Sequence, residues 1–222
     1  MRVLVACDKF KDALTAPRAC AVIAATLREM RPDWSTDLCP LADGGEGFAD
    51  ILTRAAGGRI VSLTVTGPRG APQTAGFGLV TLDRIPAAAR ARLDLPAPTP
   101  AGATVAVIEM ATASGLALLA PEERDPWQTT TAGTGELIRA AAQQGVAAIL
   151  LGVGGSATND LGLGALDALG LRCVDRHGAP IHPPIPARWA DVVRLTGRVA
   201  PDLPPIRIAC DVTNPLLGAR GA

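Results

Sequence analysis

The sequence predicts an α/β protein built on a parallel sheet, with a second, smaller α/β domain inserted. Short continuous apolar segments, such as RVLVAC at 2–7 and AAILLGV at 147–153, are typical of strands buried on both faces. Helical patterns and glycine-rich turns lie between such segments, as in alternating α/β folds. Two alternating segments, 59–66 and 74–80, interrupt this order and indicate a hairpin, which predicts the smaller domain.

The first third of the chain predicts the order strand, helix, strand, helix. After the strand at 2–7, a Thr-Ala-Pro segment can begin a helix that covers about 16–30. A second strand at 36–41 leads into the turn ADGGEG at 42–47, which begins a helix that ends near Gly57. The polar loops therefore follow the carboxyl ends of strands, where open α/β sheets bind ligands.

The remaining elements follow from similar patterns. The hairpin is joined by the turn GPRG at 67–70, and a Pro- and Ala-rich loop at 83–103 carries a short helix. The later elements are expected in the order strand 104–110, helix 133–145, strand 147–153, helix 161–169, strand 171–175, helix 187–195 and strand 206–211.

These elements divide into two expected domains. Residues 1–58 and 120–170 are assigned to the first α/β domain, which contains the parallel sheet. Residues 59–119 and 171–222 are assigned to the second, mixed α/β domain.

Composition excludes several classes of function. Twenty-one basic and 21 acidic residues balance, so we expect neither a nucleic-acid partner nor a membrane surface. No apolar stretch reaches the roughly 18 residues of a membrane-spanning helix. The N-terminus resembles a strand rather than a signal peptide. Five scattered cysteines without C-x-x-C spacing predict reduced thiols and a cytoplasmic protein, not a zinc site.

The two lysines are unusual in their placement. Arginine supplies the other 19 basic residues, yet Lys9 and Lys11 fall within three positions of each other. An ammonium is a compact point charge with rotatable donors, which the planar guanidinium does not reproduce. We therefore expect the lysine pair to mark an active-site edge, with chance clustering as the alternative.

Four polar loops follow predicted strands and share groups that suit phosphate. Glycine N–H groups can cradle a phosphate, lysine offsets its charge, and carboxylates hold Mg²⁺ or accept a proton. The alternatives are helix N-caps for the aspartates and an Asx turn before proline. The loop residues are Asp8, Lys9 and Lys11; Asp43, Gly44, Gly45 and Glu46; Gly154, Gly155, Ser156, Asn159 and Asp160; and Asp211 and Asn214. Glu109, at the end of VAVIE, is a fifth acidic position.

Two known nucleotide-binding motifs, the Walker sequence and the dinucleotide-binding glycine motif, are relevant to these loops. The Walker sequence G-x-x-x-x-G-K-[ST] is absent, which excludes a P-loop kinase. Residues 152–157 match G-x-G-x-x-A after a strand, and Asp175 follows about 20 residues later, as in NAD-dependent dehydrogenases. Against this alternative, Asp160 would place a carboxylate where the pyrophosphate docks.

The loops resemble the bacterial glycerate kinase family, which is unrelated to P-loop kinases. The matching segments span the chain in order, and ADGGEG with GGSATND is the most specific combination among them: DKFKDALTA (8–16), PLADGGEGFADIL (40–52), VTGPRG (65–70), VIEMATASGLALL (107–119), RDPWQTTTAGTGELI (124–138), GVGGSATNDLGLGALDALG (152–170) and CDVTNPLLGARGA (210–222). The resemblance implies ATP- and Mg²⁺-dependent phosphorylation of D-glycerate to 2- or 3-phosphoglycerate, by a monomer or homodimer. It also implies two α/β domains, one with a flavodoxin- or Rossmann-like parallel sheet, with the active site in the cleft between them.

The resemblance also implies roles for the loop residues. The catalytic candidates are Lys11, Lys9, Asp43 and Asp211, and the tentative Mg²⁺ ligands are Asp43 and Asp160. The candidates for binding substrate or phosphate are Asp8, Gly44, Gly45, Glu46, Gly154, Gly155, Ser156, Asn159, Asp160 and Asn214.

Three departures from the family pattern stand out. The triplet CDK replaces a PDS-like triplet, so that Lys11 rather than Lys9 aligns with the family's usual lysine. Residues 83–103 form a longer connection than usual. Family members continue beyond the position of Ala222, so the C-terminal part of the family fold is expected to be missing. The alternative function is therefore an inactive, ligand-binding remnant.

Overall fold

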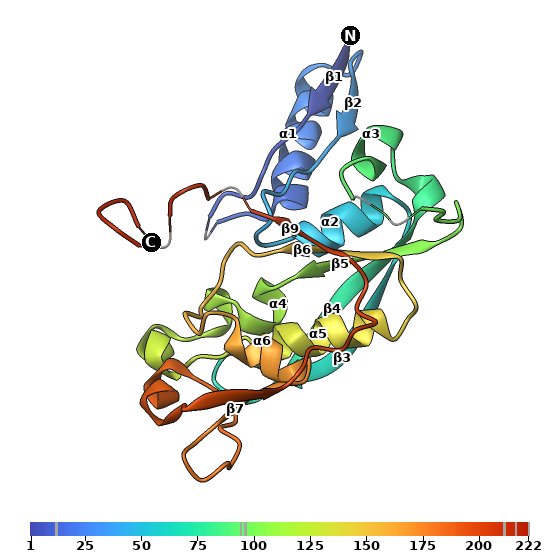
Figure 1. Cartoon of the computed structure of the whole chain (residues 1–222). Coiled ribbons are helices and arrows are strands. Elements are labelled where there is room, and N and C mark those ends of the chain that lie inside the picture. The colour runs from blue at the N-terminus through green and yellow to red at the C-terminus, as the bar shows by residue number, and fades with distance from the viewer. Residues whose placement is uncertain (12, 94, 96, 211, 216, 222) are drawn as a thin grey trace.

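A five-stranded mixed sheet forms the centre of the molecule (Figure 1). The computed structural model describes residues 1–222 except 12, 94, 96, 211, 216 and 222. The strand order is β3–β4–β5–β6–β9, with the first three strands antiparallel and β5, β6 and β9 parallel. The strands are β3 (Arg59–Thr66), β4 (Pro72–Thr81), β5 (Thr104–Glu109), β6 (Ala148–Gly152) and β9 (Ile206–Ala209). This arrangement confirms the expected α/β class and the hairpin.

Helices cover both faces of this sheet. Helix α2 (Phe48–Ala55) lies on one face, and α4 (Ala111–Ser114), α5 (Ala132–Ala142) and α6 (Leu163–Ala168) lie on the side of the other (Figure 1). Strand β5 shows why both faces are apolar. Its alternate residues Ala106 and Ile108 join the core beneath α5, whereas Val107 joins the core beneath α2. A continuous apolar strand is therefore buried on both sides, as its sequence predicts.

A separate unit contains the N-terminus. Strands β1 (Arg2–Val5) and β2 (Ser35–Leu38) pair in parallel, and α1 (Ala16–Met30) packs against them. Val5 is only 4% exposed, but Leu4 on the other face is 65% exposed. Burial of segment 2–7 on both faces was therefore wrongly predicted, because among the described residues β1 pairs only with β2 and α1 covers one face.

The expected helix at 187–195 was also wrong. The chain forms a 3₁₀ turn at Pro186–Asp191 and then strand β8 (Arg194–Gly197), which pairs antiparallel with β7 (Leu171–Val174). The apolar residues just before β8 are β-branched, and they favour an extended chain when a partner strand is available. The remaining short elements are α3 (Ala87–Arg90), within the expected 83–103 loop, and 3₁₀ turns at Leu82–Arg84, Leu116–Leu118, Pro121–Glu123 and Pro126–Gln128.

Strand pairing does not follow the expected domain boundaries. Strand β5 comes from the expected smaller domain and β6 from the larger one, yet Val107 and Leu150 are paired in one sheet. In the described chain the strands instead form distinct sheets, which are the β1–β2 pair, the central sheet and the β7–β8 hairpin. The two-domain division at 58, 119 and 170 stays a prediction. No helix in the described part of the chain is long and apolar enough to cross a membrane.

Candidate active site

Two glycine-containing loops meet beside the end of β9, at the carboxyl ends of the parallel strands. The peptide N–H of Gly154, after β6, donates to the carbonyl of Gly44, after β2, at 3.0 Å. A Cβ on Gly154 would lie 2.7 Å from Gly45 Cα, and one on Gly152 would lie 2.5 Å from the Gly44 oxygen. A Cβ on Gly44 would meet the Ala209 oxygen at 2.7 Å. These loops can approach one another this closely only because the positions lack side chains.

Lys9 joins the loop after β1 to the loop 42–47. Its Nζ lies 3.3 Å from Asp43 Oδ1 and 3.8 Å from Asp8 Oδ1. The Asp43 carboxylate also accepts the Gly45 N–H at 3.0 Å. That hydrogen bond, followed by the bond and charge of Lys9, lowers the pKa of Asp43 although burial opposes it. Asp43 is therefore an ionised, half-exposed carboxylate beside an ammonium.

A cavity of about 150 Å³ opens beside this pair. It lies between the start of α1 and the start of α2, so that two loops after parallel strands form its walls. Its lining residues include Lys9, Thr15, Pro17, Glu46, Gly47 and Asp50. The expected residues Asp8, Lys9, Asp43, Gly44, Gly45 and Glu46 are thus brought together at one end of the sheet.

Glu109 was noted in the sequence but not assigned to the site. It ends β5 opposite Gly152, is 4% exposed, and accepts the Ala49 N–H at 3.3 Å. Burial raises the pKa of Glu109, whereas the N–H groups of Ala49 and Gly47 oppose this effect. A carboxylate at the end of an otherwise apolar strand was the available sequence signal.

The loop GGSATND lies partly in the site and partly in the core. The Gly154 N–H is taken by Gly44, and the Gly155 carbonyl accepts the Leu116 N–H at 2.9 Å. Within the described chain, the Gly155 N–H has no protein acceptor. Ser156 Oγ bonds to Thr158 Oγ1 at 2.8 Å and accepts the Thr158 N–H at 3.0 Å. Gly155 is therefore better placed than Gly154 to offer an N–H to a ligand.

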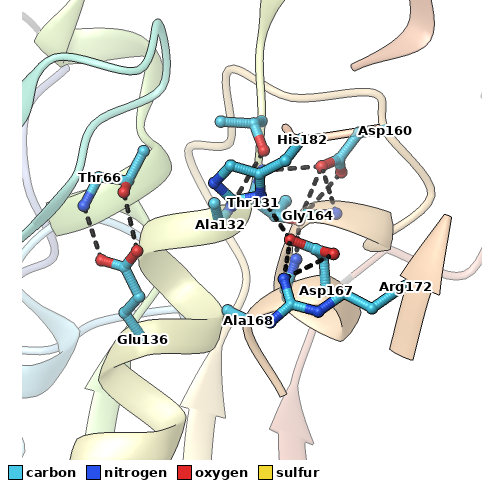
Figure 2. A network of polar contacts seen from close by, with 12 residues as sticks. Thr66, Thr131, Ala132, Glu136, Asp160, Gly164, Asp167, Ala168, Arg172 and His182 are labelled. Carbon is cyan, nitrogen blue, oxygen red and sulfur yellow. Dashed lines mark hydrogen bonds and ion pairs between the residues drawn. The ribbon is translucent and has the colours of Figure 1, made fainter. Parts of the chain in front are cut away.

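Asp160 has a different role from the one expected. It is 1% exposed, and its carboxylate accepts the Thr131 N–H at 2.8 Å, the Thr131 hydroxyl at 2.8 Å and the Gly164 N–H at 3.1 Å (Figure 2). It also accepts the Gly162 N–H at 3.1 Å. With its oxygens engaged by four donors, Asp160 joins the start of α5 to the start of α6. Its expected contacts with Mg²⁺ or phosphate do not fit this geometry.

The neighbouring carboxylates in Figure 2 also have partners within the protein. Glu136 on α5 accepts the N–H and the hydroxyl of Thr66, both at 2.8 Å. Asp167 on α6 contacts Arg172 at 3.2 Å and the His182 ring Nδ1 at 2.6 Å. The Glu136 contacts connect α5 to the end of β3, and the Asp167 contacts connect α6 to β7 and to the segment between β7 and β8.

The other expected residues lie on the surface or outside the described chain. Lys11, Asn159 and Asn214 are exposed. Among the described residues, Lys11 makes no hydrogen bond or ion pair, which leaves its ammonium free at the loop after β1. Asp211, the fourth expected catalytic residue, lies outside the described residues.

The geometry does not support the dinucleotide-binding alternative. That motif needs a helix directly after the glycines, but α6 begins only at Leu163. Strand β7, which precedes Asp175, pairs with β8 and not with β6. Asp175 is therefore not on the neighbouring parallel strand, where a ribose-binding acid belongs.

Comparison with known proteins agrees with the arrangement of the loops. The model of the "Glycerate kinase family" matches residues 3–222. The chain is 40% identical to a glycerate kinase of Bacillus subtilis (strain 168) and 37% identical to the glycerate 2-kinase of Escherichia coli (strain K12). It is wholly covered in both alignments, and it spans 53% and 54% of the relatives' lengths.

A solved structure gives the same result. A Salmonella typhimurium LT2 protein, named as a candidate glycerate kinase 2, matches with a TM-score of 0.73 at 40% identity. The match covers all of this chain and 55% of that one. From the family match over residues 3–222 and these relatives, the chain belongs to the glycerate kinase family.

Proposed function

We propose that the loops after β1, β2 and β6 bind ATP and D-glycerate, and that the site transfers the γ-phosphoryl group to a glycerate hydroxyl. The observation that carries this proposal is the Lys9–Asp43 pair beside glycine-rich loops at the carboxyl edge of the sheet. Phosphoryl transfer depends mainly on positioning and on stabilising charge, and this loop cluster offers both.

In this proposal the cations take the negative charge of the substrates. Lys9 lies against Asp43, and the ammonium of Lys11 lies two residues away at the surface. Lys11 suits a phosphate or the glycerate carboxylate, because its ammonium has no competing partner among the described residues. The glycerate oxygen attacks the γ-phosphorus, the bond from that phosphorus to the ADP oxygen breaks, and the hydroxyl proton passes to the carboxylate of Glu46, which lines the cavity.

The donor set fits Mg²⁺ only as an ion shared with substrate. No cluster of three or more His, Cys, Asp or Glu side chains suited to a metal occurs among the described residues. Mg²⁺ in nucleotide sites commonly takes one or two carboxylates together with water and phosphate oxygens. Asp43, with its lowered pKa, suits such a position. When bound, Mg²⁺ would supply positive charge to the phosphate oxygens.

Other expectations from the sequence stay proposals. The five cysteines are all unpaired thiols, which supports a reducing compartment and hence the cytoplasm. The oligomeric state, monomer or homodimer, and the absence of membrane or nucleic-acid partners stay predictions.

One observation favours the alternative of ligand binding without turnover. In the described chain β1 pairs only with β2, and α1 covers only one face of this small sheet. The loop that carries Lys9 follows this small sheet. A chain that only binds its ligands would bind ATP without releasing ADP. Isothermal titration combined with a turnover assay therefore separates the two functions.

The activity is tested by measuring ADP release that depends on D-glycerate. Asp43→Asn should lower the rate at least about 100-fold, because it removes the ionised group beside Lys9. Asp175→Asn is the matched control, since Asp175 lies in the β7 turn and should leave the rate unchanged. Equal rates for Asp43→Asn and the unmodified chain would refute the site.

A further inference from the structure

A buried carboxyl group lies directly beneath the loop 42–47. Glu109 ends β5 at the centre of the sheet, opposite Gly152, whose missing Cβ makes room for Gly44 and Phe48. Its carboxylate accepts the N–H of Ala49, in the first turn of α2, at 3.3 Å. Glu109 thus ties the sheet to the end of the loop that carries Asp43.

Helix α2 has no side-chain cap of its own. Gly47, at the N-cap position, has φ +88°, and the acid in the first turn, Asp50, pairs with Arg54 at 2.7 Å. The free N–H groups at a helix N-terminus attract negative charge. Here Glu109 supplies that charge from a neighbouring strand, in a buried position.

Two charged side chains of the adjacent loops, Glu46 and Lys9, act on this carboxyl group. Burial is the largest cause that raises the pKa of Glu109, and the charge of Glu46 adds to it. Lys9 opposes this effect, and the same ammonium pairs with Asp43 and Asp8. Glu109 therefore competes with Asp8 and Asp43 for the charge of Lys9. It also competes with a bound phosphate for the N–H groups at the start of α2.

We propose that Glu109 is a positioning residue for the loop 42–47: it holds the loop through the Ala49 N–H, and its charge sets how strongly the α2 N-terminus attracts phosphate. The effect on phosphate rests on the proposed function. Protonated Glu109 leaves the positive groups to the ligand, whereas ionised Glu109 takes part of their attraction.

The test compares the chain with Glu109→Gln, which keeps the shape and an oxygen acceptor but removes the charge. ATP affinity is measured by isothermal titration from about pH 5 to about pH 8. The ratio of the two dissociation constants, unmodified chain over variant, should fall toward one as the pH is lowered. It should reach about tenfold at the alkaline end, which corresponds to an interaction of about 1.4 kcal/mol between bound ATP and the charge of Glu109. Taking the ratio cancels the titration of ATP itself.

Glu136→Gln is the matched control. Glu136 is a partly buried glutamate that also accepts a backbone N–H, that of Thr66, but it lies on α5 at the opposite face of the sheet. Its ratio should stay near one at every pH. A purely structural role of Glu109 would give the same flat result for Glu109→Gln, and that result would overturn the proposal.

A second measurement does not depend on ATP. Carbon-13 NMR of the glutamate carboxyl groups follows the titration of Glu109 in the unmodified chain and in Lys9→Met. Loss of the ammonium should move the titration to higher pH; an unchanged titration would overturn the proposed coupling. If this shift occurs but the unmodified chain binds no ATP, the proposed function fails while the positioning of the loop by Glu109 stands.

Discussion

Gly45 and Gly154 lie in backbone contact, because a Cβ on Gly154 would come within 2.7 Å of Gly45 Cα. The first glycine follows β2 and the second follows β6, so the contact joins the N-terminal unit to the central sheet. The candidate site depends on this contact, since it holds Asp43 beside the loop that follows β6.

Gly154→Ala should separate the two loops. Overpacking a backbone contact costs about 1–3 kcal/mol, so the free energy of unfolding should fall by that amount and activity should fall with it. Urea denaturation and ADP release measure the two effects. Gly102→Ala is the control, because a Cβ there meets nothing within 4 Å. A Gly154→Ala variant as stable and active as Gly102→Ala would contradict the close packing.

Asp160→Ala should act on stability rather than on metal affinity. Removal of the carboxylate leaves buried donors of Thr131 and Gly164 without an acceptor, which costs about 3 kcal/mol in unfolding free energy. Thr131→Val, which removes one hydroxyl, should cost less. Chemical denaturation measures both. A stable Asp160→Ala chain with weakened Mg²⁺ dependence would restore the role expected from the sequence.

Lys9→Met should change the dependence of stability on acid. The folded-state pKa of Asp43 is lowered, so its contribution is present above the ordinary value of 3.8 and is lost as pH falls through the folded value. The variant should keep part of this effect, because the Gly45 N–H is its largest cause. Since Asp43 is 46% exposed, the difference should be small.

The measurement is thermal unfolding of both proteins from about pH 7 to about pH 3. The difference between them should be steady at neutral pH and should shrink in acid. A difference that grows as the pH falls would show that another group controls it. Lys11→Met, whose ammonium pairs with no described residue, should match the unmodified chain in this experiment.

The two faces of β1 should respond differently to polar substitution. Val5→Ser removes a side chain buried against α1 and should cost about 2 kcal/mol in unfolding free energy. Leu4→Ser affects a side chain that is 65% exposed and should change stability by no more than about 0.5 kcal/mol. Urea denaturation tests both. A large loss with Leu4→Ser would mean that another surface covers this face.

Much of the fold could be predicted from local patterns. The hairpin expected at 59–66 and 74–80 is found at Arg59–Thr66 and Pro72–Thr81, because a glycine turn and alternation are local signals. Strand β8 could not be predicted in this way. Its extended form depends on pairing with β7, about 20 residues earlier in the chain.

The site was predictable to a similar extent. Asp8, Lys9 and Asp43 could be predicted to lie together, because loops that follow parallel strands meet at one edge of a sheet. The burial of Asp160 depends on Thr131, 29 residues earlier, so its loop motif does not reveal it. Glu109 gave a signal, a charge at the end of an apolar strand, but its contact with Ala49 is 60 residues distant in sequence.

The most direct test of the proposed phosphoryl transfer is phosphorus-31 NMR of the chain mixed with ATP, Mg²⁺ and D-glycerate. The site described here predicts a phosphate monoester signal that grows as the γ-phosphate signal of ATP declines. This signal should be absent without D-glycerate, and it should grow at least about 100-fold more slowly with Asp43→Asn. A monoester signal that forms equally well with Asp43→Asn would contradict the account, as would intact ATP at high enzyme concentration.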